Sequence, residues 1–231
     1  MQVRLTLLDG FELTHGQERV SLPLGAQRLV AFLALHDRPL LRIHVAGALW
    51  LDATEERSCA NLRSALWRLR QPGCAIVEAT STHVGLSHEV VVDVRELVGA
   101  ARRLLDGIDE PDLADLEEAR RAGELLPDWY DDWLHTERER IRQLRLHAIE
   151  QFAERLLDAG RYGQVFDLLL GALRRDPLRE SSHRLLLRAH LAEGNSSEAI
   201  RHYRAYRDRL KADLGLEPSP RIVELLPASA S

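Results

Sequence analysis

Polar and apolar residues alternate over the first part of the chain, which is the pattern of half-buried β-strands. Residues 3–13 (VRLTLLDGFEL) predict a strand that is broken at the turn pair Asp9-Gly10. A polar turn follows, and a second strand is predicted at residues 20–22. The N-terminus is therefore expected to form a small antiparallel sheet.

From Ala26 the apolar spacing becomes helical, and three helices are predicted before residue 75. The first carries a broad apolar face and ends at Arg38-Pro39. The second covers residues 42–52, and its expected core positions are Ile43, Val45, Leu49 and Trp50. The third covers residues 55–70 and stops at the sequence QPG (71–73). Residues 75–87 then predict a hairpin with a Thr/Ser-rich tip.

After residue 92 the pattern is almost entirely helical. The acidic segment 108–119 is expected to be a loop that enters a helix, and the segment 125–134 (LLPDWYDDWL) is a cluster of aromatic residues broken by proline. Residues 135–160 predict one long amphipathic helix that ends at Gly160.

A weak internal repeat follows the long helix. Gly160 and Gly194 lie 34 residues apart, and at the same offset Val165 matches Ala199. A helix-turn-helix period of this length is that of tetratricopeptide repeats, in which helical hairpins stack into a solenoid. The second helix of each pair is expected to end at Asp176-Pro177 and at Glu217-Pro218.

Composition is that of an ordinary globular protein, with 231 residues, 45% hydrophobic and 29% charged. The sequence has no apolar run long enough to span a bilayer and no signal-peptide pattern at its start. Cys59 and Cys74 are not spaced as metal ligands, and such sparse cysteine predicts a reducing, cytoplasmic location. The net charge of -5 does not exclude nucleic acid as a partner, because binding depends on local charge.

The helix at residues 58–70 (SCANLRSALWRLR) has an unusual distribution of charge. At 100° per residue one stripe is apolar, and it consists of Leu62, Ala65, Leu66 and Leu69. The opposite face carries Asn61, Ser64 and Arg68, with Arg63 and Arg70 on one flank and Trp67 at an intermediate angle. No acidic residue lies between Arg57 and Arg70, so the solvent face is uniformly positive.

Two interpretations of this helix are open. Amphipathic helices rich in arginine are common as ordinary solvated helices. Alternatively the helix enters a major groove, where Asn61, Ser64 and Arg68 contact base edges, Arg63 and Arg70 hold phosphates, and Trp67 packs on the sugar-phosphate or on a neighbouring subunit. The two preceding helices and the following hairpin favour the second interpretation, because that order is typical of a winged helix-turn-helix.

The stretch from residue 22 to residue 70 resembles the DNA-binding domain of the Streptomyces antibiotic regulatory protein (SARP) family, an OmpR-type winged helix with an N-terminal sheet. The matching motifs are Leu24-Gly25, Gln27-Arg28, Leu49-Trp50, Leu62-Arg63 and Arg68-Leu69-Arg70. The helical remainder resembles the bacterial transcriptional activation domain (BTAD) that follows in this family. That match is carried by residues 141–150, 176–180 and 198–218.

The resemblance implies a mainly α protein with two domains. Residues 1–92 would form the winged helix-turn-helix, and residues 93–231 an all-α, tetratricopeptide-like domain. The family binds direct repeats of double-stranded DNA near promoters, often as two copies side by side, and contacts RNA polymerase. We therefore expect a transcriptional activator that is a homodimer at least on DNA, with no membrane association. The chain is expected to be either a small member of the family or a fragment of a longer protein.

The predicted wing departs from the family pattern. The family usually has a Gly-Tyr-Arg-like run, whereas this chain has the sequence HVGL at residues 83–86. Thr82 and His83 are predicted to replace the missing contacts. Residues 1–90 carry nine arginines and nine acidic residues, so modest or salt-sensitive DNA binding is expected. These features leave an alternative function open, in which the helical domain is a protein–protein adaptor and the N-terminal domain does not bind DNA.

Other candidate chemistry is weak. No pair among His36, His44, His83 and His88 has metal-ligand spacing, and no glycine-rich loop for phosphates is present. Asp131, Asp132 and Glu137 lack a nearby nucleophile, so no enzyme, metal or cofactor is predicted. Cys59 is either a small buried thiol or a redox switch. Trp129, Tyr130 and Trp133 are expected to pack between domains or at a helical corner, with a ligand pocket as the alternative.

Overall fold

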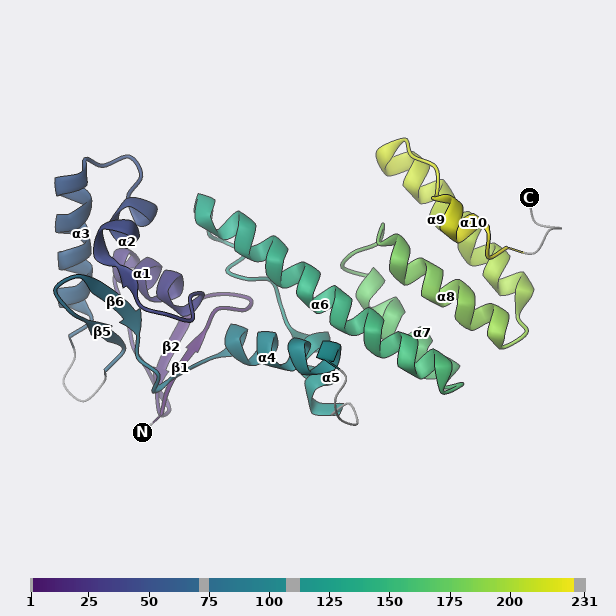
Figure 1. Ribbon diagram of the computed structural model, residues 1–231, viewed down its shortest axis with the longest axis horizontal. Helices are drawn as coiled ribbons and strands as arrows, with labels where there is room; N and C mark the ends of the chain where they lie inside the picture. Colours follow the sequence, from purple (N-terminus) through teal and green to yellow (C-terminus); the bar gives the residue numbers. More distant parts are fainter. Residues whose placement is uncertain (1, 71–74, 107–112, 227–231) are drawn as a thin grey trace. The chain divides into compact units, whose positions relative to one another are not determined.

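The computed structural model describes residues 2–70, 75–106 and 113–226. It is mainly helical, with small sheets near the N-terminus followed by a helical remainder, as predicted (Figure 1). The chain folds as two compact units. The first consists of Met1–Gly99 and Ala122–Ile141, and the second of Ala100–Arg121 and Arg142–Ser231. The predicted boundary at residue 92 and the tetratricopeptide character stay predictions.

The N-terminal sheet has four strands in the order β3-β2-β1-β7. Its first three strands are β1 (Val3–Thr6), β2 (Glu12–His15) and β3 (Glu18–Arg19), which pair antiparallel as expected. The predicted turn at Asp9-Gly10 is confirmed, since both residues have positive φ angles of 63° and 146°. The strand predicted at residues 20–22 is wrong, because the hairpin turns earlier, at Gly16 (φ 64°).

The fourth strand, β7 (Val90–Val92), was not predicted. It runs parallel to β1, with Val3 opposite Val90 and Leu5 opposite Val92. Its run of three valines reads from sequence as the start of the following helix, and only the distant partner strand makes it a strand. Asp93 then begins the next helix, and its carboxylate accepts hydrogen bonds from the backbone N–H groups of Leu7 and Leu8 at 3.0 Å.

The three predicted helices and the hairpin are present, but each helix ends two to four residues earlier than predicted. The helices are α1 (Leu24–Ala34), α2 (Arg42–Leu49) and α3 (Glu55–Arg68). The hairpin strands β5 (Val77–Ala79) and β6 (His83–Leu86) pair with the short strand β4 (Leu40–Leu41) in the order β4-β6-β5. The sequence QPG lies outside the described residues.

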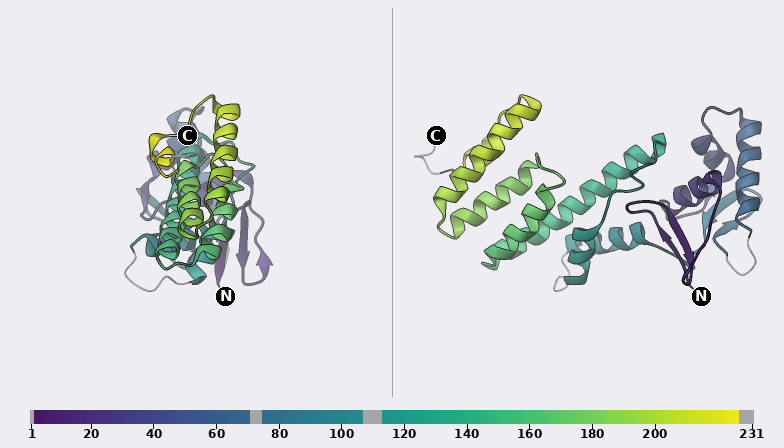
Figure 2. Two further views of the ribbon diagram at one scale, coloured as in Figure 1. Left: turned by 90° about the vertical axis from the view of Figure 1, so that its right-hand side faces the viewer. Right: turned by 180° about the vertical axis from the view of Figure 1, so that it is seen from behind.

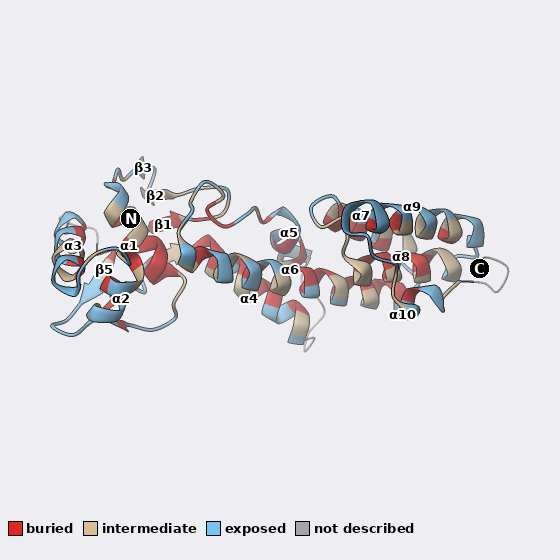
Figure 3. Ribbon diagram, turned by 90° about the horizontal axis from the view of Figure 1, so that it is seen from above, coloured by how far each residue is buried: buried red, intermediate tan, exposed pale blue. Residues whose placement is uncertain are grey.

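Two of the predicted core positions of α2 are wrong. Val45 and Leu49 are buried as expected, but Ile43 is 52% exposed and Trp50 is half-buried. Helix α2 has only eight residues, and its buried side consists of Val45, Ala46 and Leu49. Ile43 therefore points away from the core. The buried side chains of α1 and α3 instead supply the apolar centre, with Leu29, Leu33 and Leu62 almost fully buried (Figure 3).

Residues 122–141 belong to the first unit although helical elements precede them. Leu8 forms a β-bridge with Leu125, and the backbone N–H of Asp9 donates to the carbonyl of Glu124 at 2.8 Å. The ring of Trp129 stacks on Phe11 at 5.9 Å between centroids, and Trp133 meets Phe32 edge-on at 5.2 Å. The aromatic segment thus packs on side chains of the first unit, whereas Tyr130 is exposed.

The helical elements are α4 (Asp93–Asp106), α5 (Leu113–Arg121), α6 (Asp132–Asp158), α7 (Tyr162–Leu173), α8 (Glu180–Ala192), α9 (Ser196–Leu214) and α10 (Pro220–Val223) (Figures 1 and 2). The long helix is confirmed as α6. The glycines of the internal repeat both follow a helix with positive φ, at 70° for Gly160 and 85° for Gly194. Among the described residues, no helix combines the length and apolar character that a membrane span requires.

The helix ends predicted at the two prolines lie too far along the chain. Helix α7 ends at Leu173, before Asp176-Pro177, and α9 ends at Leu214. Gly215 caps α9 in the left-handed conformation, with φ 68°, and its N–H donates to the carbonyl of Lys211. Glycine stops the helix here because it adopts positive φ without a side-chain penalty.

Candidate nucleic-acid interface

Helix α3 buries the predicted apolar stripe. Leu62, Ala65 and Leu69 are buried and Leu66 is half-buried. The helix begins after Thr54, whose hydroxyl accepts a hydrogen bond from the backbone N–H of Arg57 at 3.4 Å. Glu55 and Glu56 lie in its first turn, where the helix dipole favours negative charge. The cap determines where α3 begins, and burial of the apolar stripe determines which side faces solvent.

The solvent side of α3 carries the predicted contact residues. Arg63, Ser64, Trp67 and Arg68 are exposed, and Asn61 is half-buried. The indole of Trp67 is 68% exposed, and the guanidinium carbon of Arg68 lies 5.6 Å from its ring centroid. This cation–π contact orients the arginine without neutralising its charge. The Ser64 hydroxyl donates to the carbonyl of Ala60 at 3.1 Å, so its oxygen can still accept hydrogen bonds from outside.

A groove of about 560 Å³ separates the C-terminal half of α3 from the hairpin strand β5. Three arginines line it, namely Arg42, Arg63 and Arg70. Arg42 was not predicted as a site residue. Its guanidinium donates to the carbonyl of Thr80 at 3.1 Å, and its backbone N–H donates to the carbonyl of Thr82 at 2.9 Å. The pairing of β4 with β6 brings it beside the hairpin, which no local sequence signal indicates.

The tip of the hairpin is an ordered turn. The Thr80 hydroxyl oxygen accepts hydrogen bonds from the backbone N–H groups of Thr82 (3.3 Å) and His83 (3.0 Å). Thr82 Oγ1 lies 2.9 Å from Nδ1 of His83, and both side chains are exposed. The hairpin strands carry no arginine, and Arg42 supplies positive charge at this place. Arg42 therefore partly replaces the arginine that the hairpin lacks relative to the family pattern.

The positive charge of α3 is not neutralised within the described part of the chain. No ion pair joins Arg63, Arg68 or Arg70 to a carboxylate there, whereas other surface arginines, such as Arg4 beside Glu96 at 2.7 Å, are paired. Arginine presents planar, forked donors that match phosphate oxygens and the guanine edge. The exposed side of α3 therefore suits a polyanion that also presents hydrogen-bonding groups, as a nucleic acid does.

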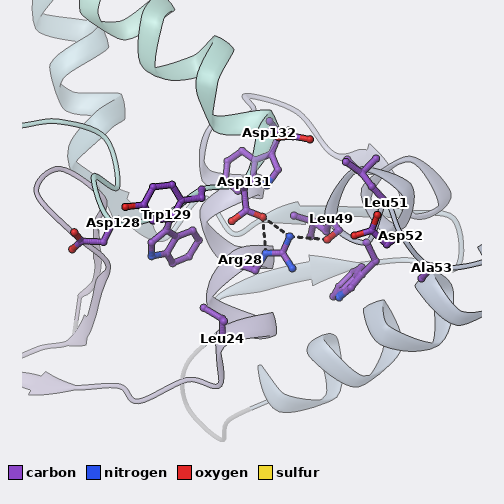
Figure 4. A pocket seen from close by; sticks show the side chains of 14 residues that line it. Leu24, Arg28, Leu49, Leu51, Asp52, Ala53, Asp128, Trp129, Asp131 and Asp132 are labelled. Carbon is purple, nitrogen blue, oxygen red and sulfur yellow. Dashed lines mark hydrogen bonds and ion pairs between the residues drawn. The ribbon is translucent and has the colours of Figure 1, made fainter.

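A second surface feature of the first unit is a groove of about 620 Å³, here called the aromatic groove (Figure 4). It is lined by Trp50, Trp129, Tyr130 and Trp133 together with the carboxylates Asp52, Asp128, Asp131 and Asp132. At its centre Arg28 Nε lies 2.7 Å from Asp131 Oδ1, and Arg28 Nη2 donates to the carbonyl of Leu49 at 2.8 Å. The rim includes exposed apolar side chains, since Leu24, Leu51 and Tyr130 are 64%, 66% and 87% exposed.

The structure offers little for catalysis or metal binding. No cluster of three or more histidine, cysteine or carboxylate side chains suited to a metal is present among the described residues. Asp131 is paired with Arg28, and Asp132 is exposed beside it, so the two do not form a shared acid–base pair. Cys59 is half-buried, and Cys74 lies outside the described residues.

Comparison with known proteins places the helical part of the chain in a family. The model of the bacterial transcriptional activator domain matches residues 90–228. The chain is 28% identical over 208 residues to the regulatory protein AfsR of Streptomyces coelicolor, covering 85% of this chain and 21% of that protein. It is 24% identical over 237 residues to AfsR of Streptomyces griseus, covering 96% and 24%. The chain thus spans about a fifth to a quarter of the length of these relatives.

A solved structure has the same fold. The structure of Mycobacterium tuberculosis EmbR in complex with a low-affinity phosphopeptide matches 99% of this chain and 67% of that chain, with a TM-score of 0.68 and 21% identity. The family model covers well over half of this chain, and both curated relatives are regulatory proteins. The chain therefore belongs to the bacterial transcriptional activator domain family.

Proposed function

We propose that this regulator binds double-stranded DNA in a sequence-specific manner and that α3 lies in the major groove. The observation that carries the proposal is the exposed charge of Arg63 and Arg68 on α3 and of Arg70 just after its end, for which the described residues offer no ion pair, on a helix whose other side is buried. A helix of this kind fits the major groove, and its position before a hairpin is that of a winged helix-turn-helix.

Each candidate contact residue has a proposed role. Arg68, Ser64 and Asn61 contact base edges, because they lie on the side of α3 away from the core. Arg63, Arg70 and Arg42 hold phosphates through the groove that they line. Trp67 packs on the sugar-phosphate, and Thr82 and His83 contact the backbone from the hairpin tip.

Selection from a pool of random DNA duplexes tests this function. The chain should enrich a motif, and by family resemblance that motif should occur as a direct repeat bound by two copies. A variant with Arg63, Arg68 and Arg70 all changed to glutamine should enrich nothing, while the matched change of Arg19, Arg201 and Arg204, which are exposed elsewhere, should leave the motif unchanged. If the unaltered chain enriches no motif, the proposal is wrong.

Activation requires contact with RNA polymerase, for which the aromatic groove is the proposed surface. Exposed apolar residues lie beside Asp52, Asp128 and Asp132, which form no ion pair with any described residue, and this combination suits a partner segment with apolar and basic side chains. In transcription reactions with purified polymerase, Leu51→Ser with Tyr130→Ser should lower activation while DNA binding persists. Unchanged activation by that double variant would exclude the groove as the contact.

A second candidate function is a protein–protein adaptor. It would work through the second unit, Ala100–Arg121 and Arg142–Ser231, here called the helical unit. It is favoured by two exposed apolar side chains, Leu214 at the last position of α9 and Leu216 just after the helix. The same DNA selection separates the two candidates, because an adaptor without DNA binding enriches no motif. Changing both Leu214 and Leu216 to serine should abolish binding of a partner protein to this surface. The same change should leave any selected DNA motif unchanged.

A further inference from the structure

A straight row of polar side chains follows the solvent side of α3, and it has one more member than the contacts proposed above. Arg57, Asn61, Ser64 and Arg68 are spaced four, three and four residues apart along the chain. At 100° per residue they lie within about 60° of one another around the helix axis. Arg57, Ser64 and Arg68 are exposed and Asn61 is half-buried. These four residues are here called the polar row.

Arg57, the added member, carries a charge that no described residue balances. No ion pair joins its guanidinium to a carboxylate within the described part of the chain. Glu55 and Glu56 precede it, but side chains one or two positions apart on a helix do not face each other. Arg57 also lies in the first turn of α3, where the helix dipole disfavours a cation. Its charge therefore does not stabilise the helix and is available to a ligand.

The two inner members of the polar row are uncharged. The Ser64 hydroxyl donates to the carbonyl of Ala60 at 3.1 Å, so its oxygen faces a ligand as an acceptor. The side-chain amide of Asn61 offers a donor and an acceptor, and it has no hydrogen-bond partner among the described residues. In the major groove an acceptor suits the amino groups of cytosine and adenine, and an asparagine amide suits adenine.

Arginine stands at both ends of the polar row. A guanidinium can only donate hydrogen bonds, and its fork matches the O6 and N7 acceptors of guanine. At the far end, the guanidinium carbon of Arg68 lies 5.6 Å from the ring centroid of Trp67, which orients it. From Arg57 to Arg68 the helix rises about 16 Å, which equals about five base-pair steps of duplex DNA. The two ends of the row therefore fit two guanines at about that separation.

We propose that Arg57 determines sequence specificity and that the polar row selects duplexes with two guanines about five base pairs apart. Arg57 contacts one guanine and Arg68 the other. Asn61 and Ser64 contact the amino groups of adenine or cytosine between them. This inference rests on the proposed insertion of α3 into the major groove and deepens it, because it states which base edges the helix selects.

Duplex selection followed by fluorescence anisotropy on the selected motif tests the role of Arg57. Each guanine in turn is replaced by 7-deazaguanine, which pairs normally but lacks the N7 acceptor. Either replacement should weaken binding of the unaltered chain by about threefold or more. Lysine keeps the charge of arginine but loses the forked contact. In Arg57→Lys one replacement should therefore have no further effect, and in Arg68→Lys the other.

Two controls separate base contact from other roles. Arg204→Lys, at an exposed position of α9, should respond to both replacements as the unaltered chain does. Because its charge does not stabilise α3, Arg57→Lys and Arg57→Gln should unfold at the same urea concentration as the unaltered chain. A lower unfolding midpoint in both variants would make Arg57 a structural residue and overturn the inference.

Two further outcomes would overturn the inference while α3 keeps its proposed place in the groove. One is a selected motif without two guanines at about the stated separation. The other is that both 7-deazaguanine effects persist in Arg57→Lys and in Arg57→Gln, which would leave Arg57 without a base contact. A failure of the unaltered chain to select any motif is a different result, because it refutes the proposed function itself and this inference with it.

Discussion

Nδ1 of His183 lies 2.9 Å from Nε2 of His202, between helices α8 and α9. The other ring nitrogen of His183 lies 2.9 Å from the carbonyl oxygen of Pro177, which can only accept a hydrogen bond. A neutral His183 therefore carries its proton on Nε2, and Nδ1 accepts the proton of His202 Nε2. Both rings fit this arrangement in the neutral state.

This pair makes the helical unit sensitive to acid. Burial, followed by the charges of His183 and His190, lowers the pKa of His202 from 6.5 to about 4. The unfolded chain binds the proton first, so stability is complete above pH 6.5 and falls as the pH decreases toward 4, by roughly 3 kcal/mol. Urea unfolding across this pH range should show the decline.

The variant His202→Gln isolates the contribution of this ring, because its amide can still donate to His183. Its free energy of unfolding should depend less steeply on pH between 4 and 6.5. His147→Gln, at an exposed position of α6, is the matched control and should keep the slope of the unaltered chain. Equal slopes in all three proteins would refute the prediction.

Glu150 is expected to stabilise the helical unit at neutral pH. Burial alone would raise its pKa, but hydrogen bonds from Arg179, Ser181 and Ser182 outweigh burial, and the pKa is lowered. The contribution is therefore present above the unfolded value of 4.5 and is lost as the pH falls through the lower folded value. Glu150→Gln should cost about 3 kcal/mol at pH 7 and less at pH 3.

The exposed neighbour Glu154 provides the control for that measurement. It pairs with Arg188 at 2.6 Å, but both side chains are more than a third exposed. Glu154→Gln should therefore change the free energy of unfolding by less than about 1 kcal/mol. A similar cost for both variants would contradict the role given to the buried hydrogen bonds of Glu150.

Arg68→Ala should relax sequence specificity. If Arg68 contacts a base edge, its loss costs on the order of 1–3 kcal/mol on the selected motif and little on unrelated duplexes. Binding of both duplexes, measured by fluorescence anisotropy at fixed salt, gives the ratio of affinities. An unchanged ratio of affinities would show that Arg68 does not contact a base edge. The reference variant is Arg19→Ala, because Arg19 is exposed on β3.

Arg63→Ala and Arg42→Ala should instead weaken binding to all duplexes alike. Each residue is proposed to hold a phosphate from the groove beside the hairpin. Loss of one phosphate contact should reduce the slope of log affinity against log salt by about 1. Salt titrations of the two variants check this, and a slope equal to that of the unaltered chain would assign these arginines a structural role only.

Asp131→Asn should destabilise the first unit. Arg28 and Asp131 are mostly buried, with 26% and 14% of their side chains exposed, and the change leaves a buried guanidinium without its counter-charge. The expected cost is about 1–3 kcal/mol in urea unfolding. Asp132→Asn, the exposed neighbour, should stay within about 0.5 kcal/mol, and equal costs would show that the buried pair does not stabilise the fold.

Some features of the molecule follow directly from local pattern. The apolar stripe of α3 was predicted from its period alone, because side chains 3 or 4 residues apart share one side of a helix. The helix stop at Gly160 was also predicted, since glycine adopts positive φ without strain. The errors at Ile43 and Trp50 come from a helix too short to define its own buried side.

Other features depend on partners that are far apart in the chain. β7 is a strand because β1 lies beside it, and Arg42 reaches the hairpin because β4 pairs with β6. Residues 122–141 join the first unit through bonds to residues 7–9. One pocket is lined by Arg120 and Arg121 of α5, by Arg145 of α6, and by Arg174 and Arg175, which follow α7.

The sequence by itself therefore determined the presence of the first three helices, the hairpin and the long helix, the exposed charge of α3 and the resemblance to a family, because periodicity and motif spacing act over a few residues. The tertiary structure alone decided which distant residues share a surface. It brought Arg42 beside Arg63, Asp131 beside Arg28, and five arginines around Gly171. The physical reason is that burial and hydrogen bonding between distant segments choose these partners, and no local pattern encodes them.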